Sequence, residues 1–139
     1  MENRNGLVVD ARLTQVDGLA ERSAAEDMLR GVRAKRCGRV SVGADKGYDT
    51  QDFVSAMRAM GIIPHLAQND TSRRSAIDRR TTRHVSYQIS QRKRKSIEQV
   101  FGWLKTVAGL RKTRHRGALR VGWMFVFSMA AFDLMRISH

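Results

Sequence analysis

The first residues of the chain alternate between apolar and polar with the period of a β-strand. Over residues 7–14, Leu7, Val9, Ala11 and Leu13 fall on one face of the predicted strand. The dipeptide Asn5-Gly6, a strong signal for a two-residue hairpin turn, comes just before it. Only four residues precede this turn, too few for the first arm of a hairpin. The pattern therefore predicts a strand whose upstream partner is cut away, with a short edge arm or a simple loop as the alternative.

Strand and helix patterns alternate in the next segment of the chain. A capping box over residues 23–26 opens a predicted helix that ends at Gly38. Apolar runs over residues 40–44 and 62–66 predict two buried strands, and a helix capped by Asp49 is predicted between them. This order of elements predicts an α/β fold in which neighbouring strands run parallel.

The second half of the chain is basic and then strongly apolar. Residues 68–90 have no sustained periodicity and predict a long basic loop. An amphipathic pattern follows and predicts a helix from residue 90 to about residue 108. Residues 118–137 are apolar nearly all round and predict a buried terminal helix. The alternative is that this helix contacts a partner surface. A transmembrane span is disfavoured because Ser128 and Asp133 interrupt the run.

The composition indicates how many domains the chain forms, and the charge distribution indicates which class of partner it binds. The chain has 139 residues, of which 42% are hydrophobic and only one is proline, so we expect residues 1–139 to form a single domain. The formal net charge is +13. Residues 70–116 contain 14 Lys/Arg against 3 Asp/Glu, a net of +11, so most of the excess lies in one third of the chain. This distribution favours nucleic acid over a membrane surface, because the segment lacks a continuous amphipathic pattern.

The cysteine, the amino-terminal residues, the histidines and the tryptophans give no positive sign of a disulfide, a secretory signal, a zinc site or a base-stacking site. Cys37 is the single cysteine, so it has no internal disulfide partner, and we expect it to be a small buried residue. The amino-terminal residues lack the apolar region of a secretory signal, which predicts a cytoplasmic protein. The histidines show no zinc-site spacing and are expected at the surface or near DNA: His65, His84, His115 and His139. Trp103 and Trp123 are expected in the core rather than as platforms for stacked bases.

Two carboxylates are the candidates for chemistry. Asp45 follows the predicted strand 40–44 at its carboxyl end, where open α/β sheets place ligands. Glu98 lies among cations, and in a continuous helix Arg94, Glu98 and Lys105 would fall on one stripe. Two such acids on separate elements can share oxygen-ligated Mg²⁺ or Mn²⁺ ions. The alternatives are a simple turn after the strand at Asp45 and a solvated Arg–Glu pair at Glu98.

Two segments carry a family resemblance. GADKGYD (residues 43–49) and ISQRKRKSIEQVFGWLKTVAGLRKTRHRG (residues 89–117) resemble insertion-sequence transposases of the DDE class, and the likeness extends over roughly residues 1–137. The resemblance implies the carboxyl-terminal portion of a ribonuclease-H-like catalytic domain, in which Asp45 is the second catalytic Asp and Glu98 the catalytic Glu. The family pattern around this Glu is Tyr-x2-Arg-x3-Glu-x6-Lys. Here the Arg, Glu and Lys keep that spacing, whereas Gln91 stands at the Tyr position.

The resemblance also implies that one catalytic carboxylate is missing. The first catalytic Asp of the family belongs on a strand that would lie before Met1, in agreement with the shortened hairpin at Asn5-Gly6. Asp10 is a candidate stand-in, but by matching it falls on the third strand of the family fold rather than the first. The chain is therefore interpreted as a transposase fragment that is inactive alone, or as one reading frame of a split element.

The resulting hypothesis is an α/β, truncated ribonuclease-H-like fold with a short mixed sheet flanked by helices and a long apolar carboxyl-terminal helix. Its function would be metal-dependent phosphodiester cleavage and strand transfer, with Asp45 and Glu98 binding Mg²⁺ or Mn²⁺. Transposon-end DNA is the expected partner, with no membrane, and the chain could form a homo-oligomer or pair with a full-length transposase. The residues expected to contact DNA are Lys46, Tyr48, Arg92, Lys93, Arg94, Lys95, Lys105, Arg111, Lys112, Arg114 and Arg116.

Two rival hypotheses belong to other functional classes. The chain could be a non-catalytic DNA-binding remnant or regulator of transposition, for which the positive charge would matter and Glu98 would not. It could also be a structural basic protein that prefers RNA and docks a partner through its last helix. Both remain open from the sequence.

Overall fold

The computed structural model describes residues 1–15, 17–71 and 74–138, so His139 lies outside the described residues. The chain divides into two compact units. One unit contains Met1–Ala20 together with Lys95–His139, and the other contains Glu21–Arg94. The second unit carries Asp45 and the first carries Glu98.

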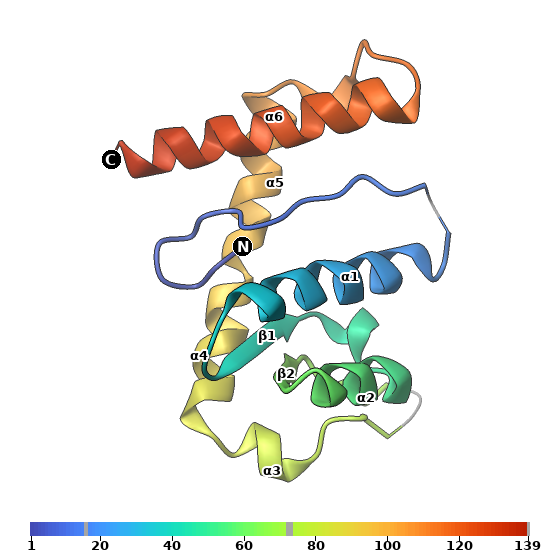
Figure 1. Ribbon diagram of the computed structural model, residues 1–139, viewed down its shortest axis with the longest axis vertical. Helices are drawn as coiled ribbons and strands as arrows, with labels where there is room; N and C mark the ends of the chain where they lie inside the picture. Colours follow the sequence, from blue (N-terminus) through green and yellow to red (C-terminus); the bar gives the residue numbers. More distant parts are fainter. Residues whose placement is uncertain (16, 72–73, 139) are drawn as a thin grey trace. The chain divides into compact units, whose positions relative to one another are not determined.

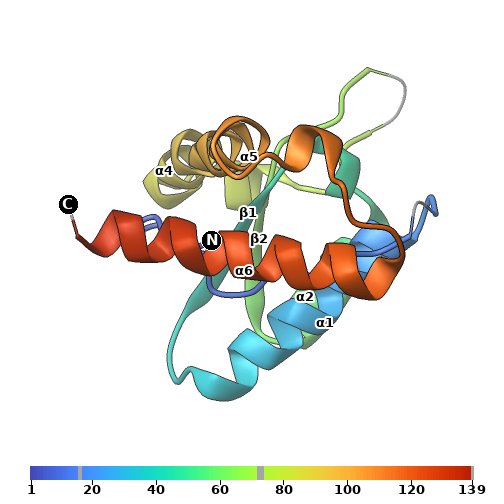
Figure 2. The same ribbon diagram turned by 90° about the horizontal axis from the view of Figure 1, so that it is seen from above.

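The unit Glu21–Arg94 is built around a two-stranded parallel sheet. Strands β1 (Val40–Ala44) and β2 (Ile62–Leu66) pair from Val40↔Ile62 to Ala44↔Leu66. Helix α2 (Gln51–Ala59) connects them. Figure 2 shows α2 and α1 (Ala20–Lys35) on one face of this sheet and α4 (Val85–Arg94) on the other. The predicted α/β class, both strands and their parallel direction are confirmed.

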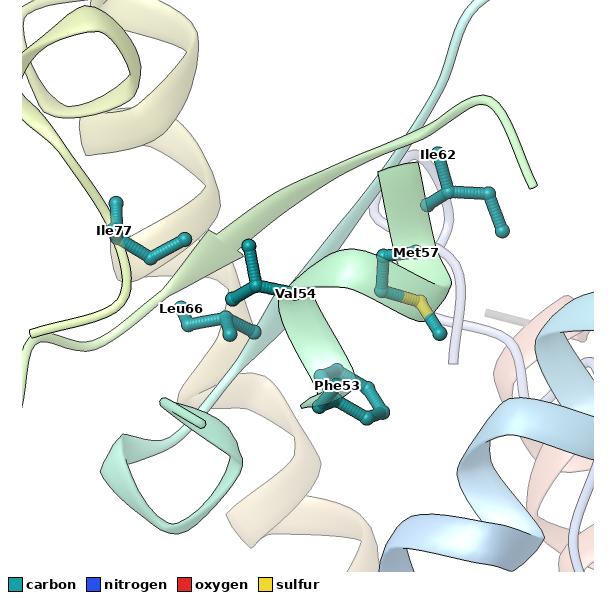
Figure 3. Close-up of a cluster of buried hydrophobic side chains, with 6 residues drawn as sticks. All are labelled: Phe53, Val54, Met57, Ile62, Leu66 and Ile77. Atoms are coloured by element: carbon teal, nitrogen blue, oxygen red, sulfur yellow. The ribbon is translucent and has the colours of Figure 1, made fainter. Parts of the chain in front are cut away.

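The core of this unit lies between α2 and the sheet. Figure 3 shows its six buried side chains, each at most 2% exposed, as sticks: Phe53, Val54, Met57, Ile62, Leu66 and Ile77. The α2 residues follow helical spacing, which turns one apolar stripe towards the strands. Burial of a side chain of this kind stabilises the fold by about 1.5–3 kcal/mol relative to exposure. This core holds the carboxyl end of β1 in place.

Polar contacts fasten α4 to the opposite face of the sheet. The Tyr87 hydroxyl donates to the Leu66 carbonyl at 2.8 Å, and the Gln91 amide donates to the His65 carbonyl at 2.5 Å. The buried His65 ring lies 2.7 Å, measured from Nδ1, from the Ser90 hydroxyl oxygen. Gly43 permits this close approach, because a Cβ there would meet the Ser90 carbonyl oxygen at 3.3 Å.

The unit of the two chain ends is helical. Helices α5 (Ser96–Thr106) and α6 (Ala118–Ile137) cross, as Figure 1 shows, and the short 3-10 helix η2 (Leu110–Lys112) follows α5. The bounds predicted for the final helix are confirmed. The buried core of this unit consists of Val100 and Leu104 from α5 with Met129 and Phe132 from α6.

The predicted strand over residues 7–14 is wrong. Residues 7–15 are described and form no strand, although the predicted turn is present at residues 3–5 and Gly6 has a φ of 74°. The Glu2 carboxylate accepts backbone N–H groups of this turn, including that of Asn5 at 2.6 Å. The Val8 N–H donates to Asp133 Oδ1 at 2.8 Å instead of to a neighbouring strand. Val8 and Ala11 pack on the helical core, whereas Val9 and Leu13 are exposed, so the alternation does not mark one buried face of a strand.

Two boundaries in the basic half also differ from the prediction. The loop predicted over residues 68–90 contains α3 (Arg79–Thr82) and the first part of α4. The helix predicted from residue 90 to about 108 is two helices, because α4 ends at Arg94 and α5 begins at Ser96. The two helices pack on different cores: α4 contacts the sheet and α5 contacts α6.

The prediction of a buried terminal helix is also wrong. Leu119 and Leu134 of α6 are 88% and 70% exposed, and the buried residues of the helix are Ser128, Met129 and Phe132. By length and composition alone α6 would be able to cross a membrane, a test that the core helix of a soluble protein also passes. Both polar residues that interrupt its apolar run bond within the unit: the Ser128 hydroxyl donates to the Met124 carbonyl at 2.8 Å, and Asp133 accepts from Val8.

Candidate metal and DNA-binding site

Asp45 lies directly after β1 with its carboxylate exposed. It caps the 3-10 helix η1 (Lys46–Tyr48), and its Oδ1 accepts the Gly47 N–H at 2.8 Å. A Cβ at Gly47 would lie 3.1 Å from that oxygen, so glycine allows the carboxylate to fold back onto the turn. Among the described residues this is its one side-chain hydrogen bond, which leaves the second oxygen able to accept a cation.

Tyr48 anchors the turn that follows Asp45. Its ring meets Phe53 edge-on, with centroids 5.2 Å apart, and is half-buried. Burial raises the pKa of the Tyr48 hydroxyl above its ordinary value, and the nearby carboxylates of Glu21 and Asp45 act in the same direction. The phenol therefore stays protonated and can donate a hydrogen bond near Asp45. Lys46 is exposed beside it.

Asp49 is a structural residue, and the prediction that it caps α2 is wrong. Thr50 caps that helix by accepting the Phe53 N–H. The Asp49 side chain is only 1% exposed and accepts the N–H groups of Asn69 at 2.8 Å and Ala76 at 2.9 Å. It therefore binds the segment after β2 to the turn after β1. The sequence gives no local signal for this role, since the partners are 20 and 27 residues away.

Hydrogen bonding orients the side chain of Arg94, the last residue of α4. Its Nε donates to Gln91 Oε1 at 3.0 Å, while the Gln91 amide donates to the His65 carbonyl. The Arg94 Cβ lies 3.6 Å from where a Cβ of Gly43 would be, two residues before Asp45. Gln91, which replaces the tyrosine of the family pattern, thus links Arg94 to β2.

Glu98 and Lys105 lie on α5 in the other unit, and both are exposed. Glu98 is in the first turn of α5, where the helix dipole favours a negative charge. Helix α4 ends at Arg94 and α5 begins at Ser96, so Arg94 lies on one helix and Glu98 and Lys105 lie on the next. The described residues contain no group of three His, Cys, Asp or Glu side chains that could hold a metal ion. Asp45 and Glu98 belong to different units, and their convergence on one ion stays a prediction.

The remaining cations of the predicted DNA contact are all exposed. They lie on α4, at the start of α5, on η2 and in the connector before α6: Arg92, Lys93, Lys95, Arg111, Lys112, Arg114 and Arg116. Exposed guanidinium and ammonium groups can reach phosphate oxygens without a desolvation cost to the fold. Their role in DNA binding stays a prediction.

A basic pocket beside α3 was not predicted from the sequence. Its volume is about 330 Å³, and Arg39, Arg58 and Arg80 line it together with His65 and other residues. Arg39 and Arg58 lie outside the basic segment 70–116, and no spacing rule links them, because the fold brings them together. His65 is only 3% exposed and therefore does not lie at the surface, whereas its expected proximity to DNA stays a prediction. The expectation of a buried Cys37 is wrong, since its side chain is exposed.

The protonation of His65 should couple pH to stability. Burial lowers the pKa of His65 below its ordinary value of 6.5, and Arg39 and His84 lower it further. Above pH 6.5 the ring is neutral in both states, but below it the unfolded chain binds the proton more readily. We therefore expect the free energy of unfolding to fall as the pH drops from about 7.5 to about 5. Urea titrations at both pH values measure this, and His65→Gln should show a smaller fall; equal falls would contradict it.

Comparison with known proteins identifies the family. The family described as "Transposase DDE domain" matches residues 1–132 of the chain. This chain belongs to the transposase DDE domain family, and the resemblance inferred from its two motifs is confirmed. The family acts in DNA transposition, binds transposon ends and generally uses divalent metal ions. No curated protein and no solved structure matches the chain.

Proposed function

We propose that this chain takes part in DNA transposition as part of a ribonuclease-H-like catalytic domain over residues 1–139 that cleaves and joins phosphodiester bonds. The position of Asp45 carries the proposal. It is an exposed carboxylate at the carboxyl end of a parallel strand, in a chain of the transposase DDE domain family. Ligands of open α/β sheets bind at this edge. Transposon-end DNA is the expected substrate.

The donor chemistry of the two acids fits Mg²⁺ or Mn²⁺. Both ions prefer carboxylate oxygens, and Asp45 and Glu98 are exposed carboxylates. Asp45 and Glu98 are the residues that would hold the ion. When bound, it would neutralise charge on the phosphate and lower the pKa of the attacking hydroxyl or water. A DDE site takes its name from three carboxylates, and these two supply part of it, so we expect weak cleavage or none by this chain alone.

The cations have a separate task. Arg94, oriented by Gln91, would bind a phosphate oxygen through its planar guanidinium group, and Lys105 would act as a point charge. The exposed cations of both units would hold the DNA backbone, and the pocket of Arg39, Arg58 and Arg80 would take a further phosphate. These contacts do not depend on the carboxylates. They also support the second candidate function, a non-catalytic DNA-binding regulator that competes for ends or pairs with a full-length transposase.

Mn²⁺ binding distinguishes the two functions. We expect the purified chain on duplex DNA to bind Mn²⁺, and Asp45→Asn and Glu98→Gln each to weaken this binding by about tenfold or more. If both acids hold the same ion, the double variant should lose far less than the sum of the two single losses. Calorimetric titration with Mn²⁺ measures these affinities.

The experiment has two controls, a variant of another exposed acid and the binding of duplex DNA without metal. Asp52→Asn changes an exposed acid in the first turn of α2 and should leave Mn²⁺ affinity unchanged. Duplex binding without metal should persist in every variant and weaken steeply with salt. Mn²⁺ affinity that is equal in the wild type, Asp45→Asn and Glu98→Gln would reject the metal site and leave the regulator.

A further inference from the structure

Helix α6 presents an exposed aromatic pair. Trp123 is 64% and Phe127 55% exposed, so the expectation of a core Trp123 is wrong. Their ring centroids are 5.2 Å apart and the ring planes differ by only 8°. Because the two residues are four positions apart on a helix, they form one stripe, and Phe127 supports one side of the indole. Large flat rings left in contact with water favour a ligand that can stack on them.

A pocket borders Trp123. It has a volume of about 640 Å³ and is lined by His115, Leu119, Arg120 and Trp123. Leu119 precedes Trp123 by four residues and Phe127 follows it by four, so Trp123 lies between Leu119, which lines the pocket, and Phe127 on one stripe of α6. Sites for small ligands commonly have volumes of about 300–1,000 Å³. The space is therefore large enough to admit a nucleobase.

The charges around this pocket identify the ligand class. Arg120 lines it, the His115 ring adds a hydrogen-bonding group, and the connector before α6 adds exposed Arg114 and Arg116. Asp133, the acid of α6, bonds to the Val8 N–H within the unit. An aromatic platform flanked by cations matches a nucleotide, whose base stacks and whose phosphate pairs with the cations. An apolar protein helix would use the rings but would give the flanking cations no partner.

The ligand must offer an unpaired base. In a DNA duplex the faces of the bases are covered by their neighbours, so an exposed indole cannot stack on them unless the strand is opened. We propose that Trp123 and Leu119 receive an unpaired base of single-stranded DNA while Arg120 and His115 bind an adjacent phosphate. This inference rests on DNA as the partner in the proposed function, but it is independent of Asp45 and Glu98.

Comparison of single-stranded and duplex DNA tests the platform. The full chain is titrated into a labelled oligothymidylate and into a duplex of equal length at one salt concentration. Trp123→Ala should weaken binding to the single strand by about 5- to 150-fold, the range for loss of one stacked base, and change duplex binding less than about twofold. The oligothymidylate should quench the fluorescence of the wild type but not that of Trp123→Ala. Arg120→Gln should weaken single-strand binding and reduce its salt dependence.

Val126→Ala is the matched control, because Val126 is 50% exposed on the same helix and does not line the pocket. It should bind both DNAs like the wild type. Equal single-strand affinity in the wild type and Trp123→Ala would overturn the platform, as would a DNA-free dimer that Trp123→Ala abolishes. Duplex binding that persists in either case would leave the proposed function intact. A wild type that binds neither DNA would reject both.

Discussion

Asp49→Ala should lower the free energy of unfolding by about 2–4 kcal/mol, because it leaves two backbone N–H groups without their acceptor. These groups belong to Asn69 and Ala76, and the carboxylate that serves them is 1% exposed. The loss is costly because buried polar groups without a hydrogen-bond partner are not solvated as they are at the surface. Urea unfolding followed by far-ultraviolet circular dichroism measures the loss.

Asp52→Ala is the matched control for this variant. Asp52 is an exposed acid in the first turn of α2, so its removal should cost only about 0.3–1 kcal/mol of favourable interaction with the helix dipole. Asp49→Asn keeps one carbonyl acceptor and should fall between the two alanine variants. Equal losses in Asp49→Ala and Asp52→Ala would show that the segment after β2 does not depend on Asp49.

The elements that the sequence predicted well are those that local burial decides. The runs 40–44 and 62–66 are short, apolar and bounded by Gly38 and Gly61 on their amino-terminal sides, and β1 and β2 have these bounds. Helix α6 begins directly after Gly117, as its apolar run predicted. Its exposure could not be predicted, because a helix that is apolar all round does not indicate which side its neighbours cover.

The wrong predictions depend on partners distant in sequence. Residues 7–14 alternate like a strand, but a strand also needs a neighbour for its N–H groups, and Val8 finds Asp133, 125 residues away. The break at Lys95 has a similar origin. Polar contacts from Tyr87 and Gln91 fix α4 to the sheet, whereas α5 packs through Leu104 on α6, so one continuous apolar stripe does not describe both helices.

In the candidate site, too, the features fixed by neighbouring residues could be predicted, and those formed by distant residues could not. Asp45 could be predicted because a strand, a turn and a glycine determine its position within a few residues. The pocket of Arg39, Arg58 and Arg80 could not, because the residue before β1 meets side chains of α2 and α3 only in the folded unit. Positive charge outside the basic segment 70–116 thus contributes to a shared basic surface within the unit Glu21–Arg94.

Phe132→Ala should have the largest effect in the unit of the two chain ends, about 3–5 kcal/mol, which is the usual cost of truncating a buried phenylalanine. Phe132 is 6% exposed and meets the Trp103 ring edge-on, with centroids 5.6 Å apart. The loss leaves a cavity against α5 and removes the aromatic contact. Denaturant unfolding followed by tryptophan fluorescence measures it, because Trp103 reports on this core directly.

Trp123→Ala separates the two sides of the same helix. Trp123 is 64% exposed, so its removal should cost less than about 0.5 kcal/mol, as is usual for surface substitutions, and the variant should stay folded for DNA binding. A loss as large as that of Phe132→Ala would mean that the exposed side of α6 is packed against another surface in solution. In that case the stacked rings of Trp123 and Phe127 would serve assembly, and an unpaired base would have no access to them.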